Sequence, residues 1–130
     1  MPVPLRVLVV DDEPVIRRIL ARSLRARGCT VLEAADGTEA LTQLLTGDYD
    51  VVISDLSMPG LSGWELWREI RRARPALAER WIFVSATPPP PVPDGPQPCY
   101  VAKPFDAEGV WREVQGIAAR NRSPRPDSDR

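Results

Sequence analysis

Five side chains that could carry chemistry stand at the ends of short apolar segments. Asp11 and Asp12 follow the first segment and Asp55 ends another. Ser85 ends a further segment, and Lys103 follows the last one. Carboxylates brought together repel one another unless a cation neutralises them, and hard oxygen ligands suit Mg²⁺. A lysine and a hydroxyl supply a charge and a donor for an anion, so the set fits phosphoryl transfer to a carboxylate nucleophile.

Each of these residues also has an ordinary structural interpretation. Asp12 alone would be a helix cap, and Asp55 alone would be a turn acid. Lys103, which precedes Pro104, would be a solvated lysine, and Ser85 would be a loop hydroxyl. Because ligands of open α/β sheets bind beyond the carboxyl ends of the strands, the joint placement of all five favours one shared site.

The segments between these residues predict alternating strands and helices. Short apolar runs rich in β-branched residues indicate strands over residues 5–10, 30–34, 50–55, 81–84 and 99–102. Helical spacing of apolar residues indicates a helix from Pro14 to Gly28, with Asp12 as its cap and Ile16, Ile19, Leu20 and Leu24 on its buried face. Parallel strands need crossover connections, so we predict a parallel sheet with helices on both faces.

Three further helices carry their own start and stop signals. Leu41 and Leu45, with Ala40 and Leu44, mark a short helix that Gly47 terminates. A capping box of Ser62 and Glu65 begins the next helix, which ends before Pro75. Asp106 is the predicted cap of the last helix, whose apolar positions are Val110, Val114, Ile117 and Ala118.

The interval from Ser85 to Cys99 breaks the alternation, because its many prolines exclude an ordinary helix. The fourth crossover is therefore predicted to be a loop. We expect residues 88–98 to leave part of the fourth- and fifth-strand face exposed for docking, with a second copy of the chain as one partner. The alternative is that Val92 and the proline rings fold back and seal the face.

Length and composition limit the other function classes. The 130 residues fit one domain over residues 1–120 with a disordered polar tail over 121–130. The formal net charge is −1, without the excess of positive charge that is typical of proteins that bind nucleic acid, so nucleic acid is not expected as a partner. No secretory leader or membrane-spanning run is present, so a cytoplasmic location away from membranes is expected. Cys29 and Cys99 are placed at opposite sheet edges, too far apart for a disulfide.

The sequence resembles the response-regulator receiver family from Arg6 to about Ala119. The matching motifs are residues 9–14 (VVDDEP), 55–63 (DLSMPGLSG), 84–86 (VSA) and 103–105 (KPF). The resemblance implies a flavodoxin-like fold with strand order 2-1-3-4-5. It further implies that Asp55 is the phospho-acceptor, that Ser85 and Lys103 contact the phosphoryl group, and that Tyr100 is the switch aromatic.

The same resemblance implies a magnesium ion bound by Asp12, Asp55 and the Ser57 backbone carbonyl, with Asp11 acting through water. The expected function is a phospho-accepting receiver that a histidine kinase, or the kinase domain of a hybrid protein, phosphorylates with Mg²⁺. A phosphate-inert binding module is the alternative. A hydrolase is disfavoured, because Ser57 stands where an aspartyl-phosphate hydrolase needs a second carboxylate. The chain is therefore expected not to be an enzyme.

Overall fold

The computed structural model describes residues 4–121 and places its strands in one parallel sheet of order β2-β1-β3-β4-β5. This is the predicted order. The strands are short and mostly buried because helices cover both faces of the sheet. They are β1 (Arg6–Val10), β2 (Thr30–Ala34), β3 (Val51–Ser54), β4 (Trp81–Ser85) and β5 (Cys99–Ala102).

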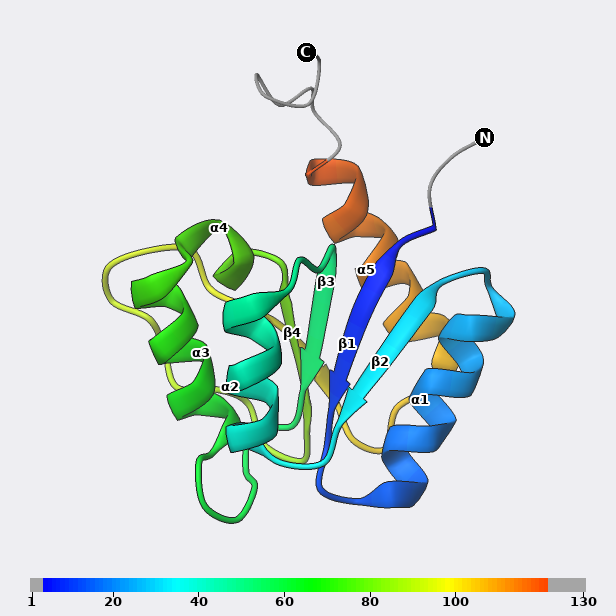
Figure 1. Ribbon diagram of the computed structural model, residues 1–130, viewed down its shortest axis with the longest axis horizontal. Helices are drawn as coiled ribbons and strands as arrows, with labels where there is room; N and C mark the ends of the chain where they lie inside the picture. Colours follow the sequence, from blue (N-terminus) through cyan, green and yellow to red (C-terminus); the bar gives the residue numbers. More distant parts are fainter. Residues whose placement is uncertain (1–3, 122–130) are drawn as a thin grey trace.

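The helices form two outer layers, which Figure 1 shows on either side of the sheet. One layer holds α1 (Pro14–Ala26) and α5 (Ala107–Arg120). The other holds α2 (Gly37–Thr46), α3 (Gly63–Ala73) and the four-residue α4 (Pro75–Ala78). The predicted end of the third helix before Pro75 is confirmed, but the short α4 was not predicted, although proline suits the first position of a helix.

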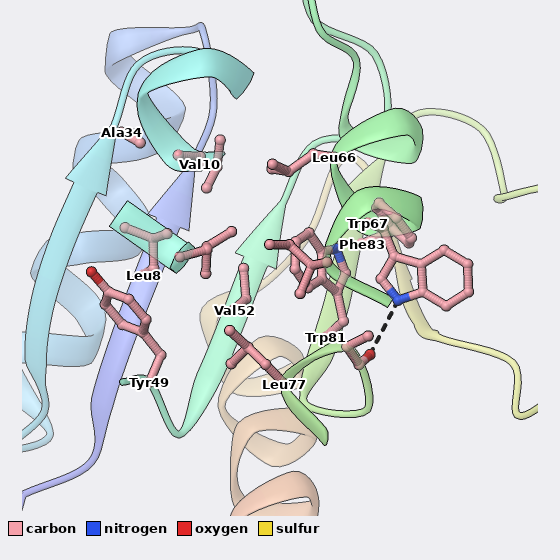
Figure 2. Packing of buried hydrophobic residues seen from close by; sticks show 14 of the residues in the cluster. Leu8, Val10, Ala34, Tyr49, Val52, Leu66, Trp67, Leu77, Trp81 and Phe83 are labelled. Atoms are coloured by element: carbon pink, nitrogen blue, oxygen red, sulfur yellow. Dashed lines mark hydrogen bonds between the residues drawn. The ribbon is translucent and has the colours of Figure 1, made fainter. Parts of the chain in front are cut away.

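The two faces of the sheet carry separate apolar clusters because neighbouring strand residues point to opposite faces. Leu8 and Val10 pack against α2 and α3, whereas Val7 and Val9 pack against α1 and α5. Figure 2 shows the first cluster around Trp67, Trp81 and Phe83. The Trp67 indole donates a hydrogen bond to the carbonyl of Ala78 at 3.1 Å, which joins α3 to α4.

Most of the predicted helix signals are confirmed. The capping box of Ser62 and Glu65 is formed, Asp106 accepts from the Gly109 amide, and Gly47 ends α2. The predicted cap of α1 is wrong: Glu13 occupies the N-cap position and makes no side-chain cap hydrogen bond. The Asp12 carboxylate lies instead in a group with two other aspartates.

Two apolar positions are more exposed than their helical spacing predicted. Ile19 is 47% exposed and Leu45 is 49% exposed. The buried residues of α1 are Leu20, Ala21 and Leu24, so the helix contacts the sheet through a narrow stripe and Ile19 lies beside it.

The proline-rich interval, residues 86–98, contains no helix and crosses from β4 to β5 as a loop. Val92 is 6% exposed and belongs to the same cluster as Trp67 and Phe83. The Val92 amide donates to Gln97 Oε1 at 2.9 Å, and Gln97 Nε2 donates back to the Val92 carbonyl at 2.5 Å. These two hydrogen bonds fix the backbone of Val92, so that its side chain stays packed in the apolar cluster.

The expected exposure of this face is therefore wrong for β4, which is buried along its whole length. Val92 fills the space that a helix would otherwise cover. On β5, Cys99, Tyr100 and Val101 are half-buried and Ala102 is exposed.

Two other sequence expectations concern cysteines and membranes. Cys29 and Cys99 are free thiols; Cys29 directly precedes the edge strand β2, and Cys99 begins the opposite edge strand β5. Within the described residues, no helix combines the length and apolar character needed to span a bilayer. Of the predicted tail over residues 121–130, Asn121 is ordered as the C-cap of α5, with its amide donating to the Ile117 carbonyl at 3.1 Å, and residues 122–130 lie outside the described part of the chain.

Candidate functional site

The register of the parallel strands brings the candidate residues to one edge of the sheet. Val10 pairs with Ser54, so Asp11 and Asp55 leave the sheet side by side, and the Asp55 amide donates to the Val10 carbonyl at 3.0 Å. On the other side, the Lys103 amide donates to the carbonyl of Ser85 at 2.9 Å. Backbone hydrogen bonds therefore fix where each functional side chain begins.

Three carboxylates meet at this edge. One oxygen each from Asp11, Asp12 and Asp55 lies within 4.8 Å of the others. Asp11 is 1% exposed and Asp55 is 8% exposed. The Glu13 amide donates to Asp11 Oδ1 at 2.9 Å and the Ser57 amide donates to Asp55 Oδ1 at 3.2 Å, so two backbone donors orient these carboxylates. The predicted ligand role of the Ser57 carbonyl stays a prediction.

Lys103 reaches across the sheet edge into this group. Its ammonium lies 2.9 Å from Asp55 Oδ2 and 3.3 Å from Asp11 Oδ2. A third contact, at 3.2 Å, joins it to Glu13 Oε1. Burial acts to lower the pKa of Lys103, but the hydrogen bond to Asp55 and the charges of Asp11 and Asp55 outweigh it, and the net pKa is raised. Lys103 is thus a fixed positive charge beside Asp55.

Asp11 is the most buried acid of the group. Burial raises its pKa, against the opposing effects of the Glu13 amide and the Lys103 charge. The nearby charge of Asp55 raises the pKa further. A divalent cation bound here would relieve this penalty, because a positive charge favours the ionised form of each carboxyl group.

Ser85 and Tyr100 lie on neighbouring strands beside the carboxylates. Ser85 is 3% exposed, and its hydroxyl accepts a long hydrogen bond of 3.5 Å from the Thr87 amide. The Tyr100 hydroxyl donates to the Ser85 carbonyl at 3.2 Å. Among the described residues, no direct hydrogen bond joins the Ser85 hydroxyl to Asp55 or Lys103. Ser85 is therefore held at the start of the proline-rich loop, next to the site.

The chain matches known proteins in sequence and in overall fold. Residues 7–91 match the family described as the response regulator receiver domain. The chain belongs to this family.

Relatives of this receiver domain include whole proteins and separate receiver domains. It is 33% identical to the transcriptional regulatory protein TcrA of Mycobacterium tuberculosis, over 93% of this chain and 49% of TcrA. It is also 33% identical to the chemotaxis protein CheY of Pseudomonas aeruginosa, over 89% of this chain and 98% of CheY. The chain thus spans about half the length of TcrA and nearly all of CheY.

Solved structures agree with this assignment. The receiver domain of the hybrid histidine kinase CckA is 36% identical, with a TM-score of 0.73 over 87% of this chain and 98% of that one. The response regulator TrrA of Thermotoga maritima, solved in complex with Mg²⁺ and BeF, is 33% identical with a TM-score of 0.73, again over 87% and 98% of the two chains.

Glu13 makes two contacts in the site that were not predicted from the sequence. Glu13 was assigned no role, yet both its amide and its side chain take part in the site. Its position directly after Asp11 and Asp12 was the available signal. The structure brings Asp11, Asp12, Asp55 and Lys103 together, with Ser85 and Tyr100 on the adjoining strands.

Proposed function

We propose that this receiver accepts a phosphoryl group on Asp55 from a phosphohistidine of a histidine kinase or of a hybrid kinase, in a magnesium-dependent reaction. One observation carries the proposal: a buried aspartate directly follows β3, with a lysine ammonium at 2.9 Å and two further carboxylates within 4.8 Å. On this proposal the chain is a phosphorylated signalling module of the cytoplasm and not an enzyme with a substrate of its own.

The donor set fits Mg²⁺ because it consists of hard carboxylate oxygens at an open sheet edge. Asp11, Asp12 and Asp55 would hold the ion, together with the carbonyl of Ser57. When bound, the ion would neutralise charge on the carboxylates and on the transferring oxygens. The metal-bound relative TrrA supports this assignment by likeness only.

The residues of the chain supply the remaining chemistry. The Asp55 carboxylate attacks phosphorus, a P–O bond forms, and the P–N bond of the donor breaks, so that the imidazole keeps the electron pair. The Ser57 amide donates a hydrogen bond to Asp55 Oδ1. The second carboxylate oxygen, Oδ2, receives no hydrogen bond from that amide. Lys103 already contacts Oδ2 and would stabilise negative charge on the transferred group.

The test is incubation with Mg²⁺ and a small-molecule phosphodonor, followed by intact-mass detection of the adduct. The wild type should gain one acid-labile phosphoryl group, and Asp55→Asn should gain none, because the amide is near-isosteric but not nucleophilic. An adduct that persists in Asp55→Asn, or maps to Ser85, would show that the acceptor is misassigned. A wild type that never gains the group would favour the phosphate-inert module.

A further inference from the structure

The groove between α3 and the proline-rich loop carries an inference that rests on the proposed function. Figure 1 shows the loop passing along the side of α3 that faces away from α2. Two adjoining hollows of about 400 Å³ each lie along this junction. Trp64, Trp67, Arg68 and Arg71 of α3 line one of them, together with loop residues 90–94.

The floor of the groove is apolar and closely packed, with Trp67 buried beneath the half-buried Trp64. The indoles of Trp64 and Trp67 stack with their centroids 5.1 Å apart. Opposite them, the buried Val92 is held by its two hydrogen bonds with Gln97. The loop is also tied to α3, because Arg71 donates to Asp94 Oδ1 at 3.0 Å and to the Asp94 carbonyl at 2.7 Å. A preformed groove of this kind binds without a large ordering cost.

The wall of the groove is positively charged. Arg68, Arg71 and Arg72 line the second hollow, and Asp94 is the acid that lines it with them. Arg71 is paired with Asp94, and Arg72 with Glu69 of its own helix. The Arg68 side chain is exposed and forms no hydrogen bond or ion pair within residues 4–121. Its charge is therefore available to an incoming group.

The loop also connects the groove to the phosphoryl site. At one end the Thr87 amide donates to the Ser85 hydroxyl. At the other end the Tyr100 hydroxyl donates to the Ser85 carbonyl. Between these two anchors, Val92 and Asp94 contact α3. A shift of Ser85 toward a phosphoryl group on Asp55 would thus pull on a segment that forms one side of the groove.

We propose that this groove is an output surface, and that it binds an acidic peptide segment of a partner protein. Apolar side chains of the segment would pack on the half-buried Trp64 indole and the exposed loop prolines, while its carboxylates would face Arg68 and Arg72. Charge complementarity selects an acidic partner, and the aromatic and arginine composition is that of energetically important interface residues.

The test uses three fluorescein-labelled peptides of equal length, measured by anisotropy at low ionic strength. One alternates glutamate with leucine, the second replaces glutamate with lysine, and the third replaces leucine with serine. The first should bind, and the other two should bind at least about tenfold more weakly. Saturable binding of the lysine peptide, or no binding of the acidic leucine peptide up to about 1 mM, would overturn the proposal.

A matched pair of variants locates the binding. Arg68→Glu places a like charge in the groove and should weaken the acidic peptide about tenfold or more. Arg22→Glu reverses an exposed arginine on α1, far from the groove in sequence, and should leave the affinity unchanged. Equal loss in both variants would show that the attraction is non-specific. Self-association that Arg68→Glu abolishes would assign the groove to a second copy of the chain instead.

The output role is tested by repeating the titration with Mg²⁺ and beryllofluoride. The affinity for the acidic peptide should change by about fivefold or more when beryllofluoride occupies the phosphoryl site, because the coupling free energy between two linked sites is typically about 1–3 kcal/mol. An unchanged affinity in a protein that gains the phosphoryl adduct would refute the output role alone. A protein that gains no adduct would contradict the proposed function, while the peptide titration without beryllofluoride would still decide whether the groove binds.

Discussion

Gly63 is the position where one methyl group tests how closely α3 packs on the site. A Cβ added at this residue would lie 1.7 Å from the Asp55 carbonyl oxygen and 2.8 Å from Ser54 Oγ. Non-bonded carbon contacts are optimal at about 3.5–4.0 Å, so either the helix or the Asp55 peptide must move by more than about 1 Å. The Gly63 amide donates to the Leu56 carbonyl, which resists movement of the helix.

We expect Gly63→Ala to lower the free energy of unfolding by about 2 kcal/mol. Overpacking costs about 1–3 kcal/mol, and the contact here is with backbone, which places the cost near the upper end. Alanine returns up to about 1 kcal/mol through its better helix propensity. The control is Gly116→Ala in α5, where, apart from the helix's own backbone, the nearest neighbour of an added Cβ is a terminal nitrogen of Arg120 at 4.0 Å. This variant should gain about 0.5–1 kcal/mol.

Urea unfolding measures both variants, and phosphodonor labelling of the same samples reports on Asp55. Labelling of Gly63→Ala should slow by about tenfold or more, since a misplacement of about 1 Å at a reacting group is costly. A wild-type unfolding midpoint for Gly63→Ala would refute the close-packing argument. Destabilisation with wild-type labelling would show that α3 moves and that the Asp55 peptide stays in place.

Three further outcomes follow from the charges and thiols. Mg²⁺ should raise the melting temperature of the wild type, and Asp12→Ala should reduce that rise, because a ligand that binds the native state stabilises it; a flat titration would count against the metal site. Lys103→Met should still be phosphorylated but lose the spectral response to beryllofluoride. Its stability deficit should shrink above about pH 10, because the lysine of the unfolded wild type begins to lose its proton there while the native Lys103, whose pKa is raised, keeps it. Burial raises the pKa of Cys29 and Cys99, so iodoacetamide should modify both more slowly at pH 8 in the native protein than in urea, and similar rates would contradict their burial.

The strand order and the position of the site were predictable because they depend on patterns that the sequence states directly. Apolar runs that end in Asp11, Asp55 and Ser85 identify the strands and, through the parallel arrangement, the edge where those residues meet. Capping signals such as Ser62 with Glu65 need only local chemistry, and they were formed as predicted.

The errors arose where the position of a side chain depends on residues that are distant in the sequence. Asp12 is of a residue type that often caps helices, but the N-cap of α1 is the next residue, Glu13. The Asp12 carboxylate lies with those of Asp11 and Asp55 instead. Glu13 was overlooked because its contact with Lys103 spans 90 positions in sequence. Val92 stands among prolines in a segment without periodicity, and only the tertiary structure shows that it fills the cluster beside Trp67. Propensity is local, whereas these outcomes depend on distant neighbours.

The charge balance at the site suggests an order of binding. Asp11, Asp12, Glu13 and Asp55 carry four negative charges when ionised, and Lys103 supplies one positive charge, which leaves a formal charge of −3. An anionic phosphodonor would be repelled by this group, whereas Mg²⁺ would be attracted to it and would reduce the charge to −1. We therefore expect labelling of Asp55 to depend on prior occupation by the cation and to saturate with Mg²⁺ concentration. Glu13 contributes one of the four negative charges. Because Glu13→Gln removes that charge and so reduces the repulsion, it should speed labelling of Asp55 by an anionic donor. An unchanged or slower rate would show that its contact with Lys103 matters more than its charge.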